Sequence, residues 1–193
     1  VTTSEHTTNL SNGVLAFNNI PIYEGTYVTN RYTVDSQNVE QKFTLNSDRA
    51  DTTTLLVDVF DNASSTNSTT FTLTDDLTVV KANSNNYFLQ ESIDGKFEVY
   101  FGDGIVGKKL SDGNVVRLRY VVTNKTEANG ASSFSSSGSI SAVSDFDILT
   151  VTSAEGGAER ESIQSIKLNA PLDYAAQGRA VSTNDFKAIV PKV

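Results

Sequence analysis

The chain contains no cysteine and no methionine, and it has a single histidine. Without cysteine it can have neither a disulfide framework nor a thiolate metal site, and it has no thiol nucleophile. His6 lies in a polar stretch near the start, which argues against a Ser-His-Asp triad and a histidine-based zinc site. We therefore predict no catalytic residues, no metal site and no cofactor, and we expect the protein not to be an enzyme.

The missing methionine includes the initiator, since the chain begins at Val1, and this suggests a piece of a longer polypeptide. Long apolar runs are also missing. No segment reaches the length of about 18 apolar residues that a membrane span needs, and residues 1–20 lack the pattern of a signal peptide. We therefore expect no membrane partner.

Positive charge is sparse, with 15 Lys and Arg against 23 Asp and Glu and a net charge of −8. Because nucleic acids bind to clustered positive charge, we expect no nucleic-acid partner. The local concentration of cations comprises Lys108, Lys109, Arg117 and Arg119. Arg117 and Arg119 fall on one side of a predicted strand, and our interpretation is a solvated face.

Carboxylates occur in close pairs, which could in principle serve glycoside hydrolysis as acid and base. Nothing in the sequence places two of them across a cleft, so turn and capping roles are favoured. The pairs are Asp58 with Asp61, Asp75 with Asp76, and Asp145 with Asp147.

Alternating apolar and polar residues predict a series of short β-strands. Phe97, Val99 and Phe101, for example, share one face of an extended chain. The run 53–60 is the most apolar in its half of the chain and should lie centrally. The predicted strands cover residues 14–17, 20–27, 29–34, 39–45, 53–60, 69–73, 77–81, 86–91, 97–101, 115–123 and 146–151. Strands at this spacing are typical of an antiparallel sandwich or barrel.

Tight turns interrupt the strands at glycine-rich sites. The sequence Phe101-Gly102-Asp103-Gly104 predicts one turn, and residues 111–114 predict a second. The segment lacks the alternating oxygen ligands of an EF-hand, and it leads into a strand where a phosphate loop would lead into a helix. We predict structural turn roles for Gly102, Asp103, Gly104, Gly107, Asp112 and Gly113.

The C-terminal part predicts two short helices. The first has Glu155, Glu159 and Glu161 near its start and is stopped by Pro171, and the second begins at Ser182 and ends before Pro191. The predicted fold is α+β and mainly β. We divide it into a polar arm or linker (1–12), a mainly antiparallel β domain (13–152) and a helical segment (153–193) that would begin a following domain of a longer chain.

Two blocks also resemble a known family. Residues 96–130, with the Phe-Gly-Asp-Gly turn, and residues 156–190, with Ala170-Pro171 and Arg179-Ala180-Val181, resemble the baseplate J-like family. The resemblance is strongest to baseplate wedge subunits of T-even-type contractile-tailed bacteriophages. Leu110 departs from the family pattern, in which proline often precedes the second turn.

The resemblance implies a late structural protein of the virion, assembled in the host cytoplasm into the tail baseplate around a central hub. It also implies self-association, as a dimer or a higher ring, and contacts with other baseplate wedge proteins. The candidate interface residues are Tyr23, Tyr27, Tyr32, Phe186, Ile189 and Val190. The alternative is a carbohydrate-binding or adhesin-type β module, in which the tyrosines would line a sugar-binding face.

Overall fold

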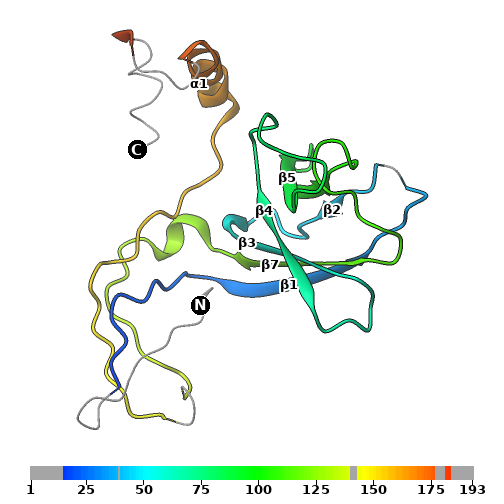
Figure 1. Ribbon diagram of the computed structural model, residues 1–193. Helices are drawn as coiled ribbons and strands as arrows, with labels where there is room; N and C mark the ends of the chain where they lie inside the picture. Colours follow the sequence, from blue (N-terminus) through cyan, green and yellow to red (C-terminus); the bar gives the residue numbers. More distant parts are fainter. Residues whose placement is uncertain (1–14, 39, 140–142, 177–180, 184–193) are drawn as a thin grey trace. The chain divides into compact units, whose positions relative to one another are not determined.

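The computed structural model describes residues 15–38, 40–139, 143–176 and 181–183. The chain divides into two compact units, Val1–Glu155 and Gly156–Val193. The first unit contains all the described strands and a short 3₁₀ helix, η1 (Lys125–Ala128), and the second contains one helix, α1 (Ile163–Ala176) (Figure 1). No helix in these described ranges combines the length and the hydropathy that crossing a bilayer requires.

Seven strands form one sheet in the order β1-β7-β3-β4-β5-β6-β2. Their bounds are β1 Thr26–Thr33, β2 Phe43–Thr44, β3 Ala50–Phe60, β4 Ser68–Leu73, β5 Asn86–Glu91, β6 Phe97–Phe101 and β7 Val115–Val122. All neighbours pair antiparallel except β4 and β5, which run parallel. The sheet is therefore mixed: the predicted mainly β class holds, and the predicted antiparallel arrangement is corrected at the single parallel pair. The reason is that residues 74–85 form turns, which carry the chain back to the start of β5 in the direction of β4.

The two edge strands of the sheet, β1 and β2, come together, so the sheet is nearly closed into a barrel. Tyr32 of β1 packs against Phe43 of β2 with 5.7 Å between ring centroids, and its hydroxyl donates to the Thr44 carbonyl at 2.5 Å. Next to this seam, the Tyr120 hydroxyl accepts the backbone N–H of Asn46 (3.0 Å) and donates to the side chain of Asn30 (2.8 Å). Side-chain contacts thus bridge the seam between the edges.

The core fills the inside of this barrel with alternate residues of each strand. On β3, Leu55, Val57 and Val59 point inward, as their predicted common face requires, and β3 lies inside the sheet between β7 and β4. The core cluster comprises Val34, Phe43, Leu45, Leu55, Val57, Val59, Phe71, Tyr87, Val99, Val116, Leu118 and Tyr120. Each large side chain buried here contributes about 1.5–3 kcal/mol of hydrophobic stabilisation.

Several predicted elements differ from the observed ones. Residues 77–81 and 146–151 are not strands. The predicted strands 20–27 and 29–34 are replaced by a single strand, β1, which begins at Thr26 after Gly25. The first predicted helix begins only at Ile163 and runs through Pro171 to Ala176, because the proline removes one backbone hydrogen bond without ending the helix. The described residues hold a single α-helix, and nearly all of the second predicted helix lies outside them.

Candidate interaction surfaces

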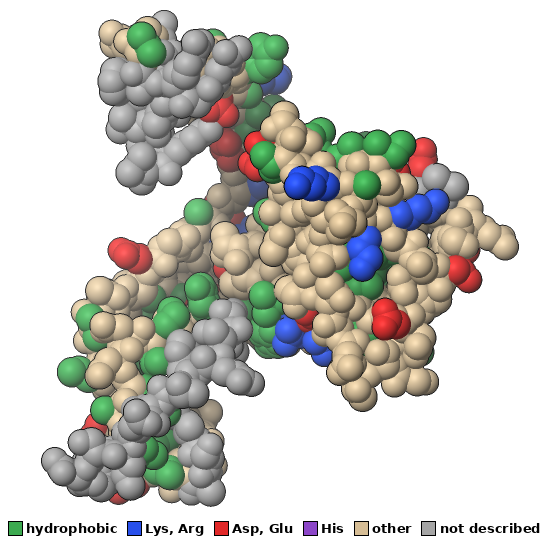
Figure 2. All heavy atoms as spheres, viewed as in Figure 1, with side chains coloured by type: hydrophobic (Ala, Val, Ile, Leu, Met, Phe, Trp, Pro, Cys, Tyr) green, Lys and Arg blue, Asp and Glu red, His purple; other side chains and the backbone are tan. Residues whose placement is uncertain are grey.

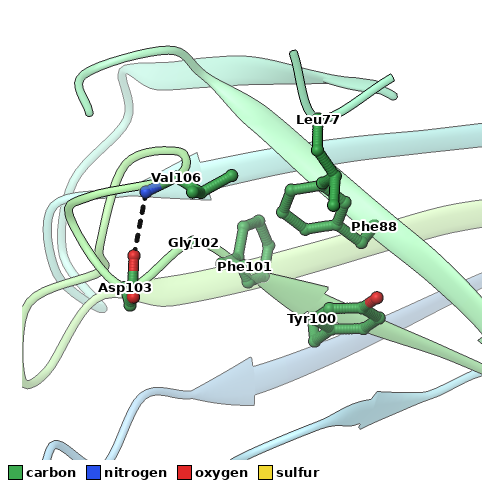
Figure 3. Close-up of a pocket in the computed structure, with 7 residues that line it drawn as sticks. All are labelled: Leu77, Phe88, Tyr100, Phe101, Gly102, Asp103 and Val106. Carbon is green, nitrogen blue, oxygen red and sulfur yellow. Dashed lines mark hydrogen bonds between the residues drawn. The ribbon is translucent and has the colours of Figure 1, made fainter. Parts of the chain in front are cut away.

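The Gly-Asp-Gly turn after β6 is held by its own backbone. A Cβ on Gly102 would lie 2.3 Å from the Val106 carbonyl oxygen, so only glycine fits there. The Asp103 carboxylate accepts the backbone N–H groups of Val106 (3.0 Å) and Ile105 (2.8 Å), and these bonds hold the pKa of Asp103 below its usual value (Figure 3). The turn closes with a bond of 3.0 Å from the Gly104 N–H to the Gly107 carbonyl. Both N–H groups that the Asp103 carboxylate accepts here thus belong to its own turn.

The second turn fastens the start of β7 to the end of β1. Gly113, at φ +77°, donates its N–H to the Val34 carbonyl at 3.0 Å, and the Asp112 carboxylate accepts the Ser36 N–H at 2.9 Å. Gly107 and Gly104 also have positive φ values, of +85° and +92°. The structure thus places all six predicted turn residues in two turns whose polar groups bond to the protein itself.

An apolar groove lies on the outer face of β5 and β6, next to the first turn. Its volume is about 300 Å³, and it is lined by Leu77, Phe88, Tyr100, Phe101, Gly102, Asp103 and Val106 (Figure 3). Phe88 and Tyr100 are directly opposite in the β5–β6 register, and their rings stack with centroids 5.2 Å apart. The groove was not predicted from the sequence, although an aromatic residue at an outward position of each of two adjacent strands was a usable signal.

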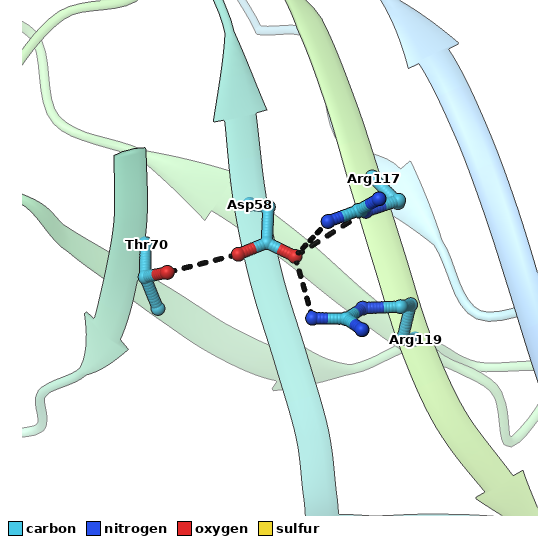
Figure 4. Close-up of polar contacts among 4 residues, drawn as sticks. All are labelled: Asp58, Thr70, Arg117 and Arg119. Atoms are coloured by element: carbon cyan, nitrogen blue, oxygen red, sulfur yellow. Dashed lines mark hydrogen bonds and ion pairs between the residues drawn. The ribbon is translucent and has the colours of Figure 1, made fainter. Parts of the chain in front are cut away.

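A cluster of charged residues lies on the outer face of β3 and β7. Asp58 of β3 is only 3% exposed, and its Oδ2 accepts Arg117 Nη2 at 2.9 Å, Arg117 Nε at 3.3 Å and Arg119 Nη2 at 3.0 Å (Figure 4). The Thr70 hydroxyl of β4 donates to the other oxygen, Oδ1, at 2.9 Å. Both oxygens of the carboxylate thus accept hydrogen bonds from side chains of the two strands that flank β3.

The arginines determine the ionisation of this carboxylate. Burial alone would raise the pKa of Asp58, but the hydrogen bonds from Arg117 and Thr70, together with the charges of Arg119 and Arg117, outweigh it. The pKa therefore lies below the ordinary value of an aspartate, and Asp58 is ionised at neutral pH. Arg119 Nε is shielded from solvent and has no hydrogen-bond partner, so one cationic donor of the cluster is not compensated.

Two sequence interpretations change here. Arg117 and Arg119 do not form a freely solvated face, because their side chains are 24% and 32% exposed and both bind Asp58. Asp58 is a buried strand residue, so its predicted turn or capping role was wrong. This buried role could have been predicted from an aspartate in the middle of the apolar run 55–60, since a buried carboxylate needs partners.

The predicted interface tyrosines differ in their surroundings. Tyr23 and Tyr27 are each 36% exposed, whereas Tyr32 is partly buried at the seam between β1 and β2. Phe186, Ile189 and Val190 lie outside the described residues.

Exposed apolar side chains gather instead on irregular segments of the first unit. Residues 130–131 and 154 pair through two backbone bonds of 2.7 Å, so the segment that ends at 154 returns beside the one that starts at 130. Exposed hydrophobic residues along these segments and the stretch before β1 are Leu15, Phe17, Ile22, Phe134, Val143, Ile148, Leu149 and Val151. Figure 2 shows hydrophobic side chains at the surface of this region.

Within the described ranges, no group of three or more His, Cys, Asp or Glu side chains could hold a metal ion. The arrangement is suited to contacts through apolar and arginine side chains.

Comparison with known proteins gives a partial similarity. The chain is similar to the baseplate wedge protein gp6 of Enterobacteria phage T4, with 26% identity over 126 residues, covering 54% of this chain and 19% of that protein. The similarity is distant, and it covers only part of each protein. No family model matches the chain. The chain spans about a fifth of the relative's length.

Proposed function

We propose that this chain is a structural part of a phage tail baseplate wedge, which associates with copies of itself and with other wedge proteins around the central hub. The observation that carries the proposal is its similarity to the wedge protein gp6. In this role the protein works by burying surface against its neighbours, and it makes or breaks no covalent bond. Assembly would take place in the host cytoplasm.

The exposed apolar side chains of the first unit support this role. Leu149 and Val151 are 89% and 72% exposed, and Phe17 and Val143 are 45% and 47% exposed. Contiguous apolar surface of more than a few hundred Å² is uncommon on monomeric proteins and marks interaction sites. Because these exposed apolar side chains include four within residues 143–151, we propose the self-contact on this segment.

Sedimentation velocity at micromolar concentration tests the self-contact. We expect a dimer or larger species for the unchanged chain, and a shift toward monomer when Leu149 and Val151 are both replaced by aspartate. Ile93→Asp is the matched control, because Ile93 is fully exposed in the β5–β6 turn and lies outside the segment 143–151. A strict monomer under all solution conditions would contradict a self-contact within this chain.

Contacts with other wedge proteins need a separate test. The chain would be mixed with purified wedge subunits of the same phage and analysed by co-sedimentation, with the Leu149→Asp and Val151→Asp double variant alongside. Co-sedimentation with at least one subunit is expected. If no subunit co-sediments, the wedge role is wrong even where self-association is found.

A carbohydrate-binding module is the second candidate, favoured by the stacked Phe88–Tyr100 pair in a groove of about 300 Å³. Sugar recognition also needs convergent polar groups, and the Asp103 carboxylate at this groove is bonded to its own turn. A glycan array separates the two proposals. Binding that is lost in Tyr100→Ala would favour the carbohydrate module.

A further inference from the structure

The outer face of β1, β7 and β3 concentrates positive charge in a chain whose net charge is −8. Arg31 of β1 lies directly opposite Arg117 of β7, and Arg117 lies opposite Asp58 of β3. Arg119, like Arg117, binds Asp58, so this face has three arginines and one carboxylate. This arginine face, defined as Arg31, Arg117, Arg119 and Asp58, therefore carries a net charge of about +2 at neutral pH.

Asp58 carries one negative charge and so balances only one of the three arginines. Its two oxygens already accept four hydrogen bonds, three of them from Arg117 and Arg119. Arg31 is exposed, and among the described residues it makes no ion pair. Its guanidinium instead lies over the Phe60 ring, 5.3 Å from the centroid. The Arg31 guanidinium is thus exposed and makes no ion pair with the described residues.

Phe60 also holds the neighbouring arginine. The Arg117 guanidinium lies 4.8 Å from the same ring centroid, and the ring itself is only 5% exposed. Two like charges that share one ring repel each other, and an anion placed between them would relieve the repulsion. The bonds to Asp58 and the stacking on Phe60 fix Arg117 in advance, which lowers the entropy that a ligand must overcome.

We propose that Arg31 and Arg117 bind the carboxylate of an aspartate or glutamate side chain on a partner protein, which approaches above Phe60. A guanidinium fork matches the two oxygens of a carboxylate, and desolvation by the partner strengthens the pairing. A nucleic acid fits less well, because the overall charge of −8 repels a polyanion and the face offers only a few cations. The inference depends on the geometry of this face alone, so it holds or fails independently of the proposed baseplate role.

NMR of the full 193-residue chain, labelled with ¹⁵N, tests the proposal. A blocked hexaglutamate peptide is titrated at low salt while the arginine Nε–Hε signals are followed. The signals of Arg31 and Arg117 are expected to shift saturably. Arg31→Ala should raise the dissociation constant about tenfold, as expected for the loss of a hydrogen-bonded charge. Arg31→Lys should raise it less.

Arg49→Ala is the control of equal charge. Arg49 is an exposed arginine just before the first residue of β3, whereas Phe60 is the last residue of that strand. The Arg49→Ala variant should leave the dissociation constant unchanged within about twofold. The absence of saturable shifts would overturn the proposal, and so would equal weakening by Arg31→Ala and Arg49→Ala. Tighter binding of a short DNA duplex than of the peptide would overturn the assignment of a carboxylate partner.

Discussion

Replacing Asp58 by alanine should destabilise the first unit markedly. The substitution removes the acceptor of three guanidinium N–H groups and one hydroxyl. Breaking a fully buried ion pair by removing one partner costs about 3–5 kcal/mol. Here Arg117 and Arg119 are 24% and 32% exposed, so water can partly replace the carboxylate. We therefore expect the free energy of unfolding to fall by about 2–3 kcal/mol.

Urea unfolding at neutral pH, followed by circular dichroism, measures this loss, and the thermal midpoint should fall by roughly 5–10 °C. Combining Asp58→Ala with Arg117→Ala completes a double-mutant cycle, in which the pair should show a coupling of about 1–2 kcal/mol. Asp61→Ala is the control, since Asp61 is an exposed aspartate in the loop after β3. A loss below about 0.5 kcal/mol for Asp58→Ala, in the range of ordinary surface substitutions, would refute the reasoning.

Three further predictions concern the same unit. In urea unfolding, Gly102→Ala should lower the free energy of unfolding by about 2–4 kcal/mol, because the new Cβ meets backbone at 2.3 Å. Gly138 has open space around it, so the control Gly138→Ala should change this free energy by less than about 0.5 kcal/mol. Tyr120→Phe should lower it by about 1–3 kcal/mol in the same assay, because the Asn46 N–H and the Asn30 side chain lose their shared partner. Asp58→Asn tests pH dependence: since the folded pKa of Asp58 is lowered, its stabilisation is present above the unfolded pKa of about 4 and lost below it. The difference in free energy of unfolding between the unchanged chain and Asp58→Asn should therefore shrink when urea titrations are carried out at decreasing pH below about 4, and a constant difference would contradict the assignment.

The strands that sequence could predict are those whose alternation reflects a buried face. On β3 and β7 every second residue enters the core, so the period of two was directly visible in Leu55, Val57 and Val59. The predicted strand 77–81 has the same local alternation, but its residues Leu77 and Val79 are 59% and 67% exposed. Strand formation there would need a partner strand, and pairing is a tertiary property that a local pattern does not contain.

The arginine face could not be predicted from the sequence for a related reason. Arg31, Asp58 and Arg117 lie on three strands that are distant in the chain and become neighbours only through the sheet order β1-β7-β3. The sequence showed two arginines on one side of a strand and an aspartate in another. These side chains become neighbours only through the register of the strand pairs. A register shift of one residue would have turned the arginines to the opposite face of the sheet.

The Gly-Asp-Gly turn, the most prominent motif of the sequence, acts on the groove indirectly. The N–H groups of Gly107 and Lys108 donate to the carbonyls of Lys81 and Ser84, at 3.2 and 3.0 Å. These bonds join the turn to the 74–85 loop, so the two loops that supply Val106 and Leu77 to the groove are held to one another. A side chain at Gly102 would displace the turn and with it one wall of the groove. Gly102 therefore preserves the shape of this apolar surface, as the proposed assembly role would require.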